Sequence, residues 1–182
     1  WNVLMLGQRR PPMADARQNN RDFTLLFLVM LITGAGNTAL QSVLPTLGRT
    51  IGVPDSVIAA AFSVSAAIWV FSAPKWARRS DRDGRREMVM LGLVGFVSSV
   101  GLCGIVLTLG LHKVLGPVVT MIAFIAARML YGIFGAAAPP AAQAMVALRT
   151  SRKERTKALT MLGSAFGLGT ILGPAAAPWL VG

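Results

Sequence analysis

One arginine, Arg128, stands inside a stretch that otherwise carries no charge from residue 114 to residue 148. A guanidinium stays ionised in proteins, and near the middle of a hydrocarbon layer it costs roughly 2.5 to 3.5 kcal/mol even on the cheaper insertion scales. It is therefore expected to face a cavity or a partner rather than lipid. Snorkelling to an interface is the alternative, because this long segment could slide by a turn. Gly132 and Ala136 continue the helix face of Arg128 at i+4 and i+8.

A group of charged side chains lies in the string "ARRSDRDGRR", residues 77–86, between two apolar stretches. Its form is small-x-x-x-Asp-Arg-x-Gly-Arg-Arg, made by Ala77, Asp81, Arg82, Gly84, Arg85 and Arg86. Gly84 permits a turn with positive φ, so Asp81 is presented close to helix ends and Arg85 and Arg86 stand where the next helix begins. An ordinary turn rich in positive charge is the alternative.

A polar stripe of Thr33, Asn37 and Gln41 recurs at i, i+4 and i+8 in another apolar stretch. Such a stripe in a spanning helix forms interhelical hydrogen bonds, each worth roughly 0.6 to 2 kcal/mol. It can equally line a substrate cavity. The residues alone leave both possibilities open.

Patterns for catalysis and for cofactor binding are missing from the sequence. It contains no phosphate-binding glycine loop, no cluster with metal-ligand spacing and no nucleophile arrangement. His112 is the only histidine and falls in a short polar segment, while Cys103 is the only cysteine and can form no disulfide within the chain. We expect no enzyme activity, no cofactor and no metal site.

The elements that must position these residues follow from composition: 54% of the residues are hydrophobic and only 14% are charged. Each charge-free interval reaches the roughly 20 residues that cross a hydrocarbon core of about 30 Å. The first interval is too long for the apolar region of a cleavable signal peptide. We therefore expect an all-α integral membrane protein with five spanning helices, at about 23–47, 56–74, 88–111, 117–147 and 158–181.

The basic residues predict how these helices are oriented. All but three of the 18 Lys and Arg residues lie in the amino-terminal tail, residues 1–22, or in the second and fourth connections, and the exceptions are Arg49, Lys113 and Arg128. Because helices alternate direction, those three segments share one side, which the positive-inside rule makes cytoplasmic. The two basic connections contain no aromatic residue except Trp76 at the membrane edge, so nucleic acid is not an expected partner, and lipid head groups are a more plausible one.

The two ends of the sequence are abrupt. It starts at Trp1, and Met13 opens "MADARQNN", a suitable beginning for a short cytoplasmic tail. Residues 1–12 are given no function, since they could be a mis-assigned start, a non-native remnant or part of a longer protein. Native translation could begin at Met13, and the native chain could extend beyond residue 182.

Three motifs, in order, resemble those of the major facilitator superfamily. Residues 77–86 resemble the signature between the second and third helices, with Ala77 where the family commonly has Gly. The resemblance implies that Asp81 and the neighbouring arginines form a charge network that latches one gate state against the other half of the transporter. "RMLYGIFGAA", residues 128–137, resembles the fourth-helix signature, in which the arginine takes part in proton-coupled conformational change.

The fifth apolar segment resembles a motif of superfamily antiporters. "GTILGPAAAP", residues 169–178, contains Gly169, Gly173, Pro174 and Ala177, although the family usually has Gly where Ala176 and Ala177 stand. Small residues every four positions give one smooth face for close packing, and a generic dimerisation stripe is the alternative. In the family this motif bends the helix, seals the outer side against leak and is associated with exporters.

The resemblance implies a first six-helix bundle of which this chain supplies five helices, with a carboxy-terminal half missing. It implies a proton-coupled exporter of drug-like or other small molecules, working by alternating access in the inner or plasma membrane. The partners are then a small-molecule substrate, protons and the lipid bilayer. No Asp or Glu lies inside a span, so any proton carrier is expected in the missing portion. The alternatives are a proton/solute symporter for sugars or organic acids, and a non-transporting truncated membrane protein.

Overall fold

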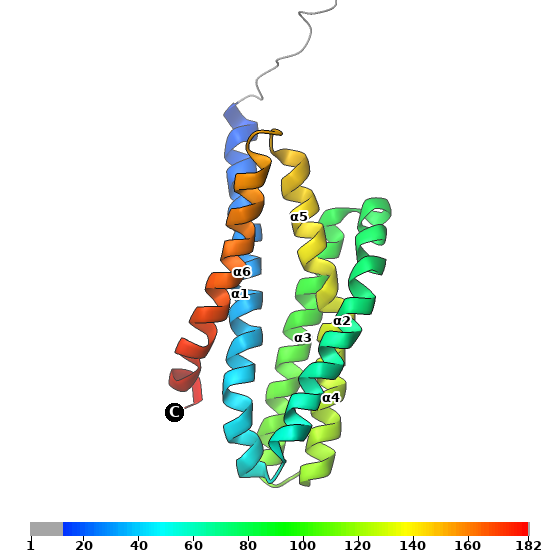
Figure 1. Cartoon of the computed structure of the whole chain (residues 1–182), viewed down its shortest axis with the longest axis vertical. Coiled ribbons are helices and arrows are strands. Elements are labelled where there is room, and N and C mark those ends of the chain that lie inside the picture. Colours follow the sequence, from blue (N-terminus) through cyan, green and yellow to red (C-terminus); the bar gives the residue numbers. More distant parts are fainter. Residues whose placement is uncertain (1–12, 182) are drawn as a thin grey trace, which may run out of the picture.

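The architecture, seen in a computed structural model, is a bundle of long helices (Figure 1). The structure describes residues 13–181, with side chains from residue 20 to residue 179, and residues 1–12 lie outside the described part. In order, the elements are α1 (Met13–Ile51), α2 (Asp55–Asp83), α3 (Arg85–Leu111), α4 (Pro117–Phe134), the short 3-10 helix η1 (Gly135–Ala137), α5 (Ala138–Arg149) and α6 (Arg155–Val181). The described residues contain no strand.

Five of these helical segments are long and apolar enough to cross a membrane, with α4, η1 and α5 together making the fourth. The prediction of an all-α protein with five membrane-length helices is therefore confirmed. Large apolar side chains point outward along the bundle, including Phe71, which is 74% exposed, and Ile171, which is 68% exposed. Such a surface suits lipid as the surrounding solvent.

The helices extend beyond the apolar intervals from which they were predicted. α1 already begins at Met13, within the segment predicted as a tail, and α2 continues past Pro74 to Asp83. Charged residues leave the hydrocarbon layer, but arginine is a good helix former and does not end a helix. α2 ends at Asp83, and Gly84, with a φ of 106°, interrupts the helical backbone for one residue before α3 begins.

The fourth span is broken where two prolines follow each other. Pro139 and Pro140 stand in the first turn of α5, and the three residues before α5 adopt the tighter 3-10 form. Neither proline has an N–H to donate to the carbonyl four residues earlier. The Ala138 N–H compensates in part by bonding to the Gly135 carbonyl, three residues back.

Figure 1 shows α1 and α6 running side by side, with α2, α3 and the α4–α5 span forming the other part of the bundle. The start of α1, the α2–α3 junction and the α5–α6 connection lie toward one end, here called the amino-terminal end. The α1–α2 and α3–α4 connections lie at the opposite end. The described parts of the three basic segments, from Met13 onward, thus lie toward the same end of the molecule.

Candidate functional site

Arg128 lies on α4 and is only 2% exposed, so its guanidinium is almost fully removed from the surface. Its Nη2 donates a 2.8 Å hydrogen bond to Oδ1 of Asn37 on α1. The rings of Phe62 and Tyr131 each lie with their centroids 4.9 Å from Cζ, which is within the range of cation–π attraction. Arg128 is thus held by a neighbouring helix and by two aromatic faces.

Two serine hydroxyls fix the backbone of α4 beside this arginine. Ser65 on α2 donates to the carbonyl of Arg128 at 3.0 Å, and Ser99 on α3 donates to the carbonyl of Ala127 at 2.8 Å. Both serines are buried, and their bonds satisfy hydroxyls that would otherwise be costly in an apolar interior. Neither residue was predicted as part of the site, although serine in an apolar span is a signal for such a bond.

Gly132 lets α4 approach α2 closely. A Cβ atom at this position would lie 2.6 Å from the carbonyl oxygen of Ser65 and 3.1 Å from Cβ of Ile68. Any side chain at residue 132 would therefore push α4 away from α2 and shift Arg128, one turn earlier. Gly132 positions the arginine rather than contacting it.

A cavity of about 630 Å³ opens beside Arg128, between α1, α2, the α4–α5 span and α6. Its polar lining includes Asn37, Gln41, Arg128 and Gln143. Its aromatic lining includes Phe62, Trp69, Tyr131 and Phe166. The volume suits a small organic molecule, and the mixture of apolar walls with a few polar groups is typical of a ligand site.

The predicted polar stripe on α1 divides between two environments. Asn37 and Gln41 line the cavity. Thr33 is buried outside the cavity lining, and its hydroxyl donates to the carbonyl of Val29 at 2.7 Å, four residues back on the same helix. Asn37 serves both predicted purposes, because it bonds across to α4 and also faces the cavity.

The residues of the second motif lie at the α2–α3 junction, at the amino-terminal end. Arg85 Nη2 and the Asp81 carboxylate form an ion pair of 3.0 Å across Gly84, and Arg79 pairs with Asp83 at 2.7 Å. Within the part of the chain that the structure describes, Arg82 and Arg86 form no ion pair, and both are exposed. Residues 77–83, which were predicted as part of the connection between two spans, are helical, and the charges project from a helix end.

Trp76 anchors this junction to the fourth span. Its Nε1 donates to the carbonyl of Ile133 at 2.5 Å, and its ring packs against Phe134 with centroids 6.1 Å apart. Arg79 lies over the same indole, 5.8 Å from the centroid. The exposed charges are thus connected to α4 one turn beyond Arg128.

The small residues of the fifth motif face α1. Ala165, Gly169, Gly173 and Ala177 are all buried. A Cβ on Gly169 would collide with the backbone of Leu31 and Ala35, and one on Gly173 with the carbonyl of Ala35. Pro174 lies inside α6 directly after the second of these contacts. The stripe is used within the chain, where it brings two helix backbones together.

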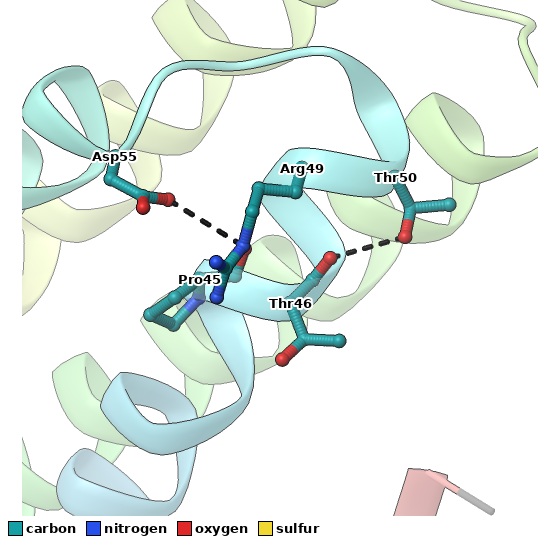
Figure 2. Close-up of polar contacts among 5 residues, drawn as sticks. All are labelled: Pro45, Thr46, Arg49, Thr50 and Asp55. Atoms are coloured by element: carbon teal, nitrogen blue, oxygen red, sulfur yellow. Dashed lines mark hydrogen bonds and ion pairs between the residues drawn. The ribbon is translucent and has the colours of Figure 1, made fainter.

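The opposite end of the molecule has a polar contact between the last turn of α1 and the start of α2. Figure 2 shows Arg49, in the last turn of α1, folded back so that its Nε donates to the carbonyl of Pro45 at 3.2 Å. The same nitrogen lies 3.9 Å from the carboxylate of Asp55, which begins α2. Thr50 donates to the carbonyl of Thr46 at 3.1 Å. Both partners of the ion pair are exposed, so it contributes little to stability.

Comparison with known proteins identifies the family. The profile of the Major Facilitator Superfamily matches residues 26–182. The chain belongs to the Major Facilitator Superfamily. It is 30% identical over 163 residues to multidrug resistance protein 2 of Bacillus subtilis (strain 168), a match that covers 88% of this chain and 37% of that protein.

Other superfamily relatives are tetracycline resistance proteins. The class D protein of Salmonella ordonez is 32% identical over 160 residues, covering 86% of this chain and 37% of the relative. The class B protein of Escherichia coli is also 32% identical over 160 residues, covering 85% of this chain and 36% of the relative. The chain therefore spans less than two fifths of the curated relatives it matches. Membership of this family makes it a multi-pass membrane protein of a transporter family.

Among the described residues, no group of three or more His, Cys, Asp or Glu side chains is placed to hold a metal ion. The cavity beside Arg128 is instead lined by amides, serine hydroxyls, aromatic rings, aliphatic side chains and one guanidinium. These groups can bind and orient a small molecule by hydrogen bonds and stacking.

Proposed function

We propose that this superfamily member forms part of a secondary active transporter that exports drug-like or other small molecules by alternating access, coupled to protons. The substrate enters the cavity beside Arg128, and a carboxy-terminal half outside this sequence completes the site. The protein sits in the inner or plasma membrane with its amino terminus in the cytoplasm. It moves its substrate without catalysing a reaction on it.

The observation that carries this proposal is the buried Arg128 at the wall of a cavity inside a membrane bundle. A guanidinium in that position is expensive, and intramembrane ionisable residues mark substrate and proton pathways. The names of the relatives, multidrug and tetracycline resistance proteins, support export over uptake. Most Lys and Arg residues lie in segments on one side of the bundle, and this supports a cytoplasmic amino terminus.

The other motifs have proposed roles in the conformational cycle. The charges at the α2–α3 junction, from Ala77 to Arg86, latch one gate state, and their exposure leaves them free to contact another domain. Gly169, Gly173, Pro174 and Ala177 keep α6 closely packed on α1, which supports a seal against leak. Arg128, positioned by Gly132, couples the state of the cavity to movement of α4.

A transport assay on the protein as the cell makes it tests the proposal. Cells that express it should accumulate less of a fluorescent drug than cells that lack it, and collapsing the proton gradient should abolish the difference. Arg128→Ala should abolish export while the protein still inserts, because the cavity loses its charged group. Arg155→Ala is the matched control, since this arginine is exposed at the start of α6 and outside the cavity.

The other outcomes of this assay would each contradict part of the proposal. Unchanged drug accumulation together with active uptake of sugars or organic acids would establish a symporter instead. A protein that inserts but moves no solute in either direction would be a non-transporting membrane protein. Near-normal export by Arg128→Ala would show that the arginine has no role in coupling.

A further inference from the structure

The cavity beside Arg128 carries a positive charge that no acidic side chain among the described residues neutralises. The acidic residues of the whole sequence fall outside the intervals 23–54, 56–80, 88–153 and 155–182, so none comes from the interior of α1, α2, the α4–α5 span or α6. Within the described residues, Nε and Nη1 of Arg128 have no hydrogen-bond partner. The cavity wall thus holds one guanidinium with a single hydrogen bond and no counter-ion.

Such an arrangement is costly without an additional partner. A charge removed from water needs both a counter-charge and hydrogen bonds to offset its desolvation. Arg128 has two aromatic faces and one neutral amide, and these offset only part of that cost. An anionic group in the cavity would provide the missing counter-charge, and the low dielectric of the interior would strengthen the attraction.

The remaining polar groups of the cavity also suit an anion. Gln41, Gln143 and Trp69 line the cavity, and each of these side chains carries an N–H donor. Amide and indole N–H groups donate hydrogen bonds to carboxylate or sulfonate oxygens, so they complement an acid without adding charge. The aromatic rings of Trp69 and Phe166 provide apolar surface for the rest of the ligand.

We propose that this cavity selects amphipathic organic anions, molecules with a carboxylate or sulfonate on an aromatic or similarly apolar body. The acidic group lies toward Arg128 and the amides, and the apolar body lies against the aromatic wall. An organic cation of the same shape is disfavoured, because it would meet a like charge in a poorly solvated space. This inference rests on the proposed function in taking the cavity as the substrate site.

Three probes of nearly the same shape test the selectivity: 2-naphthoate, its neutral methyl ester and 2-naphthylmethylammonium. Their binding to the detergent-solubilised protein, in the form that the cell makes, is measured by equilibrium dialysis. We expect 2-naphthoate to bind at least roughly tenfold more tightly than the ammonium probe, a difference of about 1.4 kcal/mol. Equal binding of the two charged probes, or preference for the cation, would overturn the inference.

Three cavity variants and one control connect the selectivity to the arginine. Arg128→Gln removes the charge and should abolish the preference, whereas Arg128→Lys keeps a positive charge and should retain part of it. Gln41→Glu adds a carboxylate to the cavity wall with almost no change in shape, and should lower 2-naphthoate affinity while raising that of the ammonium probe. Arg155→Gln removes a positive charge outside the cavity and should leave the preference unchanged.

The design separates failure of this inference from failure of the proposed function. If cells export cationic drugs while 2-naphthoate fails to bind, export stands and the anion selectivity is wrong. If 2-naphthoate binds in an Arg128-dependent manner but no solute is exported, the selectivity stands and export is wrong. If Arg128→Gln does not fold, the opposite shifts expected of Gln41→Glu decide the question.

Discussion

Gly169 lies where α6 meets the backbone of α1, so replacing it with alanine measures the contribution of that contact. A Cβ atom here would collide with the carbonyl of Leu31 and would lie 2.8 Å from the backbone nitrogen of Ala35. Separations below 3.0 Å are essentially never seen for real Cβ atoms. Because the colliding atoms belong to the backbone, no change of rotamer relieves the overlap, and the two helices must separate.

Gly167 on the same helix is the matched control. Among the described residues, no heavy atom outside its own neighbourhood lies within 4 Å of the Cβ that alanine would add there. Alanine in a helix is favoured over glycine by about 0.5 to 1 kcal/mol, and this gain applies to both variants. The difference between them therefore isolates the overpacking cost at Gly169, about 1 to 3 kcal/mol.

The measurement is reversible unfolding of the protein in mixed micelles, followed by the loss of helical circular dichroism as the denaturing detergent increases. Gly167→Ala should match or exceed the wild type in stability, and Gly169→Ala should unfold at a lower mole fraction of denaturing detergent. If the two variants have the same midpoint, α6 does not pack on α1 through this glycine, and the contact proposed for the antiporter motif is wrong.

Three further predictions concern the junction, the orientation and the support of α4. Asp81→Asn should slow transport without weakening substrate binding, because it breaks the 3.0 Å pair with Arg85 at the exposed gate rather than at the cavity, as paired flux and binding assays would show. In a background without the native cysteine, Lys113→Cys should react with a membrane-impermeant maleimide added outside intact cells, and Arg152→Cys should not; the reverse pattern would invert the proposed topology. Ser99→Ala should lower the unfolding midpoint by the equivalent of roughly 0.6 to 2 kcal/mol, since α4 loses a 2.8 Å hydrogen bond, and an unchanged midpoint would show that this bond contributes nothing.

The spanning helices were predictable because lipid imposes a simple requirement on composition. Charges are excluded from the hydrocarbon layer, so apolar intervals of sufficient length identify the spans directly. Helix ends were less predictable, because the exclusion of charge applies only within the hydrocarbon layer and does not end a helix that continues into water. α2 continues through Arg78, Arg79 and Arg82, and it ends only where Gly84 adopts a φ of 106°.

The cavity lining could not be read from periodicity because it depends on how α1 is rotated about its axis. Close contacts fix that rotation: a Cβ at Gly34 would lie 2.5 Å from the carbonyl of Phe166 on α6, and one at Gly36 would lie 2.7 Å from the ring of Phe96 on α3. With these two faces occupied, Asn37 points to Arg128. Thr33 satisfies its hydroxyl on its own helix instead.

α1 therefore contacts the cavity arginine on α4, the end of α5 and the small-residue face of α6, so a movement of α1 would affect all three. At the amino-terminal end Asp22 pairs with Arg149 of α5, and in the middle Asn37 bonds to Arg128. Between these points the backbone of α1 is packed directly on α6, where small residues leave no side chains to absorb a shift. Because packed interfaces of this kind are bistable rather than continuously deformable, α1 and α6 should move as one unit against α2, α3 and α4. This movement would change the Asn37–Arg128 hydrogen bond between α1 and α4. An anion bound beside Arg128 would therefore shift the equilibrium between the two arrangements of the bundle.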